Sequence, residues 1–199
     1  MSNSERMKVF IDFDGTITKE DVGALLFIKF GEPVAINKLV NQIDSGEITG
    51  NQGWKELFKL LPFVEQTKID KMIDSVELDP YFHELIDFLR LNNIEFWILS
   101  DGFNYYINRI FNRERLDNLN IFSNTLFFDE NGKIGTHYPF SDEECSDCAN
   151  CKRNHILSNS ADDDFTVYIG NGSSDRCPAQ YCDYIFAKDT LLRFCEKER

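Results

Sequence analysis

The segment KVFIDFDGTIT, residues 8–18, constrains the fold of this chain more than any other feature. The apolar run at residues 9–11 predicts a strand buried on both faces, which is typical of a parallel sheet. Asp12 and Asp14 follow directly, and residues two apart on an extended segment point to the same side. Two carboxylates this close repel each other unless a cation or a proton compensates one of them. The alternative is that both acids are solvated turn residues, so the rest of the chain has to decide.

Strand and helix patterns alternate through the remainder of the chain. Short apolar runs predict strands over residues 94–102, 120–129, 165–170 and 184–188, with helical patterns among them. The Asn-Gly pair that follows the second of these runs suggests a hairpin. Strands that alternate with helices indicate a parallel α/β sheet of the Rossmann-like kind.

A long helical stretch separates the first two predicted strands. Its apolar residues recur at i, i+3 and i+4, and glycine and proline interrupt it several times. It is too long for a minimal crossover between parallel strands. We therefore expect a helical cap at residues 18–80, inserted into an α/β core made of residues 1–17 and 81–199. Such a cap lies beside the carboxyl ends of the strands, where ligands bind in open α/β sheets.

The composition excludes several classes of partner. With 42% hydrophobic and 28% charged residues the chain is an ordinary globular protein, and no apolar run approaches the ~20 residues that cross a bilayer. The first residues, MSNSERMK, lack the apolar core of a secretion signal, so we expect a cytoplasmic protein without a membrane partner. A net charge of −13 argues against nucleic acid as a partner. If the substrate is an anion, its site must concentrate cationic groups.

Three polar stretches each follow a predicted strand: DFDGTIT, SDG at residues 100–102, and GNGSSD at residues 170–175. All three therefore fall on one edge of the sheet, and Lys152 lies between the last two. Asp12 is suited to attack phosphorus, and Asp14 to protonate a leaving oxygen. Ser100 and the backbone N–H groups beside Gly102 can bind phosphate oxygens, and Lys152 can neutralise phosphoryl charge. Oxygens of Asp12, of the Asp14 carbonyl and of Asn171 suit Mg²⁺.

In their order, DFDGTIT, SDG, Lys152 and GNGSSD resemble the four motifs of the haloacid dehalogenase (HAD) superfamily. The helical insertion after the first motif resembles the cap of the phosphoserine-phosphatase-like branch. Within that branch, CSDCANCK and SSDRCPA are similar to phosphatases related to 2-hydroxy-3-keto-5-methylthiopentenyl-1-phosphate phosphatase. The resemblance covers almost the whole chain.

This resemblance implies a Mg²⁺-dependent phosphatase that hydrolyses a small phosphomonoester metabolite through an aspartyl-phosphate. Asp12 would be the nucleophile and a metal ligand, and Asp14 the acid/base, with its carbonyl on the metal. Lys152 would stabilise the aspartyl-phosphate. The remaining implied roles are phosphate binding by Thr16, Ser100, Asp101 and Gly102, and metal binding by Asn171 and Asp175.

The fourth motif departs from the family pattern. It usually offers Asp where this chain has Asn171, and Asn keeps an oxygen ligand but removes a negative charge. We expect weaker metal binding as a result. The alternative function is a catalytically impaired HAD-like protein that binds a phosphorylated metabolite.

Three cysteines at C-x2-C-x2-C spacing precede Lys152, namely Cys145, Cys148 and Cys151. They can contribute to a structural Zn²⁺ site, which needs a fourth ligand such as His155, Cys177 or Cys182. The alternative is three reduced thiols in a loop, as expected of cysteines in a chain without a secretion signal.

The cap is expected to select the substrate. By the resemblance, Asp21 lies where the branch places an acid that contacts substrate; the alternative is an acid that interacts with a helix N-terminus. No arginine occurs in residues 18–80, which disfavours a substrate with a carboxylate, such as phosphoserine. Aromatic residues of the cap can line an apolar pocket or simply form core: Phe27, Phe30, Trp54 and Phe58.

Overall fold

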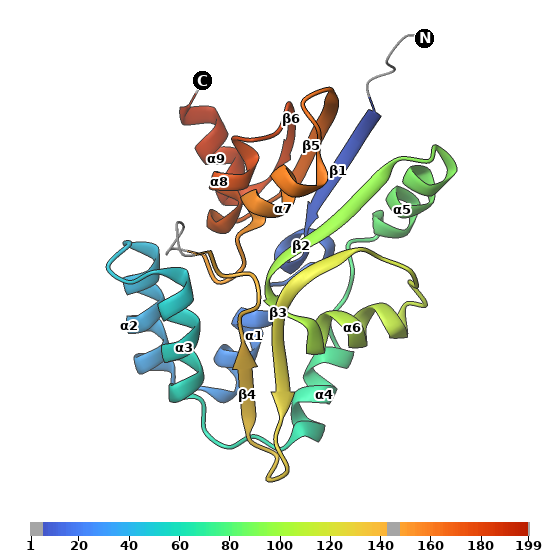
Figure 1. Cartoon of the computed structure of the whole chain (residues 1–199). Coiled ribbons are helices and arrows are strands. Elements are labelled where there is room, and N and C mark those ends of the chain that lie inside the picture. The colour runs from blue at the N-terminus through green and yellow to red at the C-terminus, as the bar shows by residue number, and fades with distance from the viewer. Residues whose placement is uncertain (1–5, 143–147, 199) are drawn as a thin grey trace.

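A computed structural model describes residues 6–142 and 148–198 of the chain (Figure 1). Six strands form one sheet in the order β4-β3-β2-β1-β5-β6. Neighbouring strands are parallel except for β3 and β4, which form the antiparallel hairpin predicted from the Asn-Gly pair. The strands are β1 (Arg6–Asp12), β2 (Glu95–Phe103), β3 (Ile121–Phe128), β4 (Ile134–His137), β5 (Asp164–Gly170) and β6 (Tyr184–Ala187).

The first strand lies in the middle of the sheet, between β2 and β5. Ile11 pairs with Ile98 on one side and with Ile169 on the other. Residues 9–11 are all buried, because helices cover both faces of the sheet at this point. This is the reason that the strand reads as a continuous apolar run rather than an alternating one.

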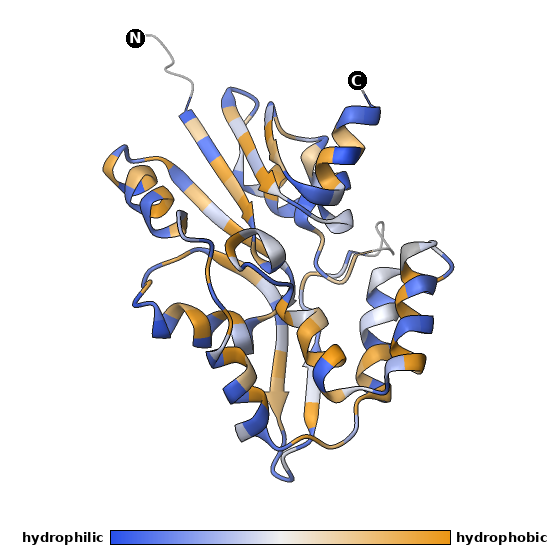
Figure 2. Ribbon diagram, turned by 180° about the vertical axis from the view of Figure 1, so that it is seen from behind, coloured by the Kyte–Doolittle hydropathy of each residue, from blue (hydrophilic) through white to orange (hydrophobic). Residues whose placement is uncertain are grey.

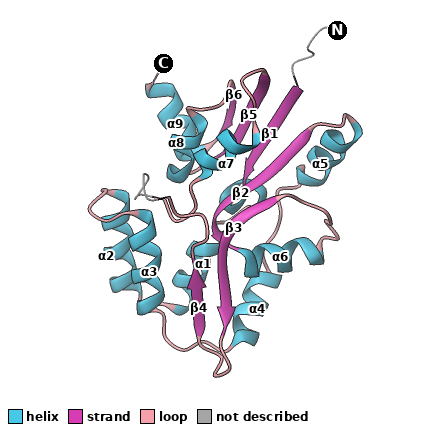
Figure 3. Ribbon diagram, viewed as in Figure 1, coloured by secondary structure: helices cyan, strands magenta, loops and turns pink. Residues whose placement is uncertain are grey.

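Helices cover the two faces of the sheet, as Figure 3 shows with strands in magenta and helices in cyan. On the face of Phe10, buried side chains come from α7 (Lys152–Asn159), α8 (Arg176–Ala179) and α9 (Asp189–Lys197). On the face of Ile11 they come from α5 (Phe82–Leu91) and α6 (Asn104–Arg113). Along the helices in Figure 2, hydrophobic and hydrophilic residues alternate, as they do in amphipathic helices. The parallel α/β core is thus confirmed.

Four helices lie between β1 and α5, which leads back to the sheet at β2. They are α1 (Val22–Phe30), α2 (Pro33–Asp44), α3 (Gly50–Leu60) and α4 (Gln66–Asp74). Thr18 and Leu78 form an isolated antiparallel bridge where the chain leaves the core and comes back. The helical cap after the first strand is therefore present. Within the described residues, no helix is long and apolar enough to cross a membrane.

Candidate active site

The carboxyl ends of β1, β2 and β5 meet beneath the cap. A cavity of about 480 Å³ opens there, lined from the core by Asp12, Asp14, Asp101, Lys152 and Asn171 and from the cap by Asp21. Parallel strands bring their carboxyl ends to one edge, so residues far apart in the chain share this cavity. The fold thus brings residues of all four motifs together, as the sequence predicted.

Two glycines allow the close approach of these segments. Gly15 has φ +74°, and a Cβ there would lie 2.4 Å from Nδ2 of Asn171. A Cβ on Gly102 would lie 1.6 Å from the hydroxyl of Tyr106 and 2.6 Å from Oδ2 of Asp14. Any other residue at these two positions would push the segments apart.

Lys152 lies between two buried carboxylates. Its Nζ is 2.5 Å from Oδ1 of Asp12 and 2.7 Å from Oδ1 of Asp175. Burial disfavours the charged ammonium, but the two carboxylates outweigh it and raise the pKa of Lys152 above its usual value. Lys152 is therefore a permanent cation beside the predicted nucleophile.

Asp175 accepts four hydrogen bonds from the protein. Oδ1 accepts from Lys152 and, at 2.6 Å, from the hydroxyl of Tyr168; Oδ2 accepts from the backbone N–H groups of Asn171 and Gly172, each at 2.9 Å. Burial alone would raise the pKa of this carboxyl, yet Lys152 and the hydrogen bonds hold it below its usual range. These contacts support an anchoring role for Asp175 rather than direct ligation of a metal.

The two acids of the first motif have different surroundings. Burial, with the nearby charge of Asp175, raises the pKa of Asp12 to about 7 against the opposing effect of Lys152. Burial raises the pKa of Asp14 well above its usual range, and the charges of Asp21 and Asp12 add to this. A raised pKa favours the protonated form of Asp14, which is the form that a general acid needs.

Hydrogen bonds hold the Asp14 side chain in place. Its Oδ2 lies 3.0 Å from the hydroxyl of Ser100 and 2.9 Å from that of Tyr106, and its Oδ1 accepts from the backbone N–H of Val22 at 3.0 Å. Ser100 is fully buried, and its hydroxyl also accepts from the N–H of Gly102. The Ser100 hydroxyl thus orients Asp14 and the turn of the second motif, and Ser100 is not among the residues that line the cavity.

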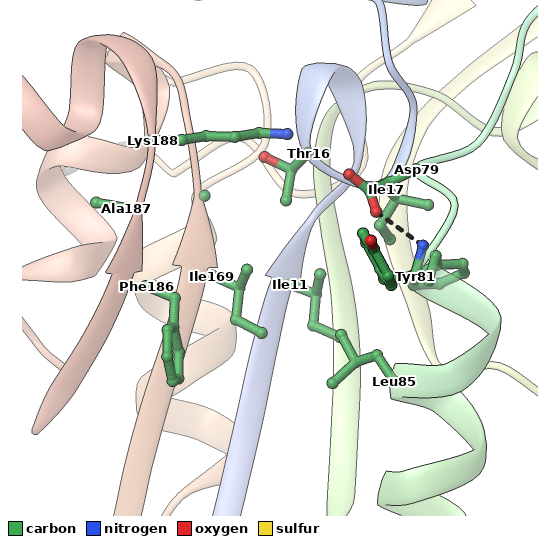
Figure 4. Close-up of a pocket in the computed structure, with 12 residues that line it drawn as sticks. Ile11, Thr16, Ile17, Asp79, Tyr81, Leu85, Ile169, Phe186, Ala187 and Lys188 are labelled. Atoms are coloured by element: carbon green, nitrogen blue, oxygen red, sulfur yellow. Dashed lines mark hydrogen bonds between the residues drawn. The ribbon is translucent and has the colours of Figure 1, made fainter.

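Thr16, predicted to bind phosphate, does not line the cavity of the acids, although its hydroxyl also hydrogen-bonds to the Asp12 carboxylate. Its hydroxyl donates to Oδ1 of Asn171 at 3.2 Å. Its side chain borders a second cavity of about 420 Å³ on the Ile11 face of the sheet, shown in Figure 4. That cavity is mainly apolar, with Asp79 and Lys188 among its few charged residues, so it offers no paired acids for chemistry.

The residues around Asp12 fit a magnesium ion. The described residues contain no group of three or more His, Cys, Asp or Glu side chains arranged for a metal. A mixed set made of the Asp12 carboxylate, the Asp14 carbonyl and the Asn171 amide oxygen needs no such group, and it offers the oxygen ligands that Mg²⁺ prefers. Asn171 packs directly on the turn of the first motif. A cation there would also lower the pKa of Asp12 and so favour the nucleophilic form.

Asp21 interacts with a helix N-terminus and also borders the cavity, so its predicted contact with substrate stays a prediction. Its carboxylate accepts from the N–H of Ala24 at 2.7 Å and caps α1, and it also lines the cavity. Burial raises the pKa of Asp21, and hydrogen bonds from the backbone of Ala24 and Gly23 oppose this rise.

Of the cap aromatics, Trp54 lines the cavity. Phe27, which is buried, and Phe58, which is partly buried, pack against its ring, and Phe30 is also partly buried. The pocket and the core thus share one aromatic cluster.

The zinc hypothesis is only partly accessible, since Cys145 lies outside the described residues. Cys148 lines the cavity and Cys151 is buried. His155, one candidate for a fourth ligand, stacks on Phe122 and bonds to the Asn150 side chain at 2.6 Å. Burial lowers the pKa of His155 to about 4, so it is a neutral structural residue.

Four residues of the site escaped the sequence analysis: Tyr106, Asn150, Tyr168 and Arg176. Tyr106 lies four residues beyond Gly102, one helical turn into the next element, and that spacing was the available signal for it. Arg176 lines the cavity from the core, directly after Asp175. The cap lacks arginine but the cavity lining does not, although the Arg176 guanidinium lies over the ring of Phe194, 5.7 Å from its centroid.

Comparisons with known proteins agree with this geometry. Residues 7–191 match the model of the Putative Phosphatase family. A 2-hydroxy-3-keto-5-methylthiopentenyl-1-phosphate phosphatase from Bacillus mycoides is 33% identical over 97% of this chain and 88% of its own length.

Solved structures share the fold. A HAD family hydrolase from Salmonella enterica serovar Typhi superposes with a TM-score of 0.76 at 17% identity, over 97% of this chain and 65% of that one. A substrate-bound phosphoserine phosphatase gives 0.72 at 18% identity, over 96% and 90%. The chain therefore belongs to the Putative Phosphatase family, and it shares its fold with a HAD family hydrolase and with phosphoserine phosphatase.

Proposed function

We propose that the protein hydrolyses a small phosphomonoester in two steps through an aspartyl-phosphate on Asp12. In the first step a carboxylate oxygen of Asp12 bonds to phosphorus, the bond to the leaving oxygen breaks, and Asp14 gives its proton to that oxygen. In the second step a water oxygen attacks phosphorus and Asp14 takes its proton. The bond between Asp12 and phosphorus then breaks, which releases phosphate and restores both acids.

The observation that carries this proposal is the contact of Lys152 with Asp12 beside Asp14, whose pKa is raised by burial, all in one cavity. Phosphoryl transfer depends mostly on positioning and on neutralising charge. Lys152 supplies a buried positive charge that neither approach of substrate nor moderate pH change removes. Asp14 supplies the proton for the leaving group.

Magnesium completes the proposed site. Asp12, the Asp14 carbonyl and Asn171 would hold it, with Asp175 as an anchor of Lys152 and the Asn171 turn. When bound, the ion neutralises negative charge on the phosphoryl group. Because Asn171 is neutral, we expect weaker binding than at a site with a third carboxylate.

For the substrate, we propose a phosphomonoester whose leaving group is neutral and partly apolar. Ile43, Trp54 and Leu57 of the cap line the cavity with apolar surface, while Asp21 offers a hydrogen-bond acceptor. The name of the Bacillus relatives describes such a compound, with hydroxyl, keto and methylthio groups. That compound, or one of the same class, is the candidate substrate here.

Arg176 makes phosphoserine the informative comparison. A substrate carboxylate would meet Asp21 and Asp101 in the cavity, but it could also pair with Arg176. We expect the neutral ester to have the higher kcat/KM. If phosphoserine is preferred and Arg176→Met removes that preference, the substrate class is wrong while the mechanism stands.

The mechanism is tested by measuring phosphate release from a panel of phosphomonoesters with Mg²⁺, with and without chelator. Asp12→Asn keeps the shape of the side chain and removes the nucleophile, so activity should fall by at least about 10³-fold, a loss comparable to that of other covalent catalysts. Asp162→Asn is the matched control, because Asp162 is exposed at the opposite end of β5. Retention of most activity in Asp12→Asn would contradict the assignment. Wild-type protein that binds phosphorylated metabolites with no turnover would favour the impaired binding protein instead.

A further inference from the structure

The cap is attached to the core unevenly. On α4, Asp74 forms a two-bond ion pair with Arg109, and Arg113 donates to three backbone carbonyls at residues 73, 74 and 76. The hairpin of α2 and α3 stands apart from α4 in Figure 1. Among its described side chains, Trp54 makes the one hydrogen bond to the core, from Nε1 to Oδ2 of Asp101 at 3.0 Å.

Asp101 connects that hydrogen bond to the catalytic segments. Its Oδ1 accepts from the backbone N–H of Asn150 at 2.9 Å, two residues before Lys152. Its own peptide follows Ser100 in the phosphate-binding turn, and its carbonyl accepts from Asn124 at 2.7 Å. One carboxylate thus joins the cap helix, the second motif and the turn that begins α7.

Asn150 strengthens this connection. Its Nδ2 donates to the carbonyls of Ser100, at 2.7 Å, and Phe122, at 3.0 Å, and its Oδ1 bonds to His155. The turn before Lys152 is therefore bound to the second motif by both the side chain of Asn150 and its backbone. The Asp101 carboxylate that accepts from the Asn150 N–H also accepts from Trp54 of the cap.

We propose that Asp101 is a positioning residue that couples the placement of Trp54 in the cap to the placement of Lys152 and the phosphate-binding turn. While Trp54 donates to Oδ2, the carboxylate is held with Oδ1 on the N–H of Asn150. When α3 moves away, the carboxylate can rotate and the turn before Lys152 loses a partner. This coupling rests on the proposed phosphatase function only for its kinetic consequences; the hydrogen bond itself can be tested without turnover.

The chain has two tryptophans, which makes the hydrogen bond directly observable. Trp97 stacks on Phe10, away from the cap, so Trp97→Phe leaves a single indole N–H signal, that of Trp54, in a ¹H–¹⁵N spectrum. We expect this signal to be shifted downfield and slow to exchange. Asp101→Asn, which turns an NH2 group or a weaker acceptor towards Trp54, should move it upfield and speed its exchange. An unchanged signal would overturn the proposal whether or not the protein is a phosphatase.

Kinetics test the coupling. Trp54→Phe keeps an aromatic ring against Phe103 and removes only the N–H donor. It should lower kcat/KM about tenfold, the effect of losing a hydrogen bond to a charged group, whereas Trp97→Phe should change it less than about twofold. Asp101→Asn combined with Trp54→Phe should lose no more than Asp101→Asn alone, because both remove the same bond. Independent, multiplying losses would refute the coupling.

Inhibition by orthovanadate distinguishes a Trp54 that positions the phosphoryl site through Asp101 from a Trp54 that contacts the leaving group. Vanadate occupies the phosphoryl site and carries no leaving group, so a Trp54 that merely touches the leaving group cannot affect it. We expect Trp54→Phe to weaken vanadate inhibition and to lower kcat. A variant that raises KM alone, with vanadate inhibition unchanged, would show that Trp54 acts on the substrate and not through Asp101. Absence of turnover in the wild type would refute the phosphatase proposal and leave the spectroscopic test of the bond intact.

Discussion

Replacing Asp175 with asparagine should destabilise the protein strongly, even though the two side chains have the same shape. Asp175 is fully buried, and its carboxylate is the acceptor in all four of its hydrogen bonds. The amide of asparagine must point its NH2 group either at Lys152 and Tyr168 or at two backbone N–H groups. In both orientations two hydrogen bonds are lost, and Lys152 keeps only Asp12 as a charged partner.

The size of the effect follows from these contacts. Removing one partner of a buried ion pair costs about 3–5 kcal/mol, because the remaining charge stays buried without compensation. Tyr168→Phe removes only one of the four bonds and should cost about 1–3 kcal/mol. A typical domain has about 5–15 kcal/mol of stability in total, so Asp175→Asn should remove about a fifth of it or more.

Urea unfolding at pH 7, followed by circular dichroism, measures the free energy of unfolding of each variant. Asp162→Asn serves as the control, since an exposed acid away from the site should change stability by less than about 0.5 kcal/mol. A loss below about 1 kcal/mol for Asp175→Asn, or one no larger than that of Tyr168→Phe, would refute the view that Asp175 anchors Lys152.

Three further predictions concern metal and protons. Asn171→Asp should lower the Mg²⁺ concentration that gives half-maximal activity, because it adds a carboxylate; an unchanged requirement would mean that residue 171 does not face the metal. If Cys145, Cys148 and Cys151 bind zinc, elemental analysis should find about one equivalent per chain, and folded protein prepared without chelator but lacking zinc would exclude the site. The lowered pKa of His155 means that below pH 6.5 the unfolded chain binds a proton that the folded chain refuses until about pH 4, so stability is lost as pH falls through that window. The loss should reach about 1–2 kcal/mol at pH 5, and His155→Gln should be less sensitive to pH in urea unfolding; equal slopes would contradict this.

The sequence by itself determined the architecture and the meeting point of the motifs. The apolar run before Asp12 could only be a strand covered on both faces, and alternating strand and helix patterns imply parallel strands. Parallel strands end on a common edge, so the motifs after β1, β2 and β5 had to converge. These inferences depend on local periodicity and on the direction of the chain, and both can be read from residues that are neighbours in the sequence.

Only the tertiary structure decided which atoms pair at that edge. The Ser100 hydroxyl bonds to Asp14, Thr16 bonds to Asn171, and both oxygens of Asp175 are taken by the protein. Which atoms pair depends on the distances between helices and strands. Packing across the whole core sets those distances, and no local sequence pattern predicts them.

Packing between cap and core also decided which residues surround the cavity. Arg176, which lies outside residues 18–80, borders it from the core, and Trp54 of the cap donates to Asp101. Trp54 and Asp101 are 47 residues apart, and they meet because the cap helices fold back over the carboxyl edge of the sheet. The sequence determined which residues could do the chemistry, and packing between cap and core decided which of them touch.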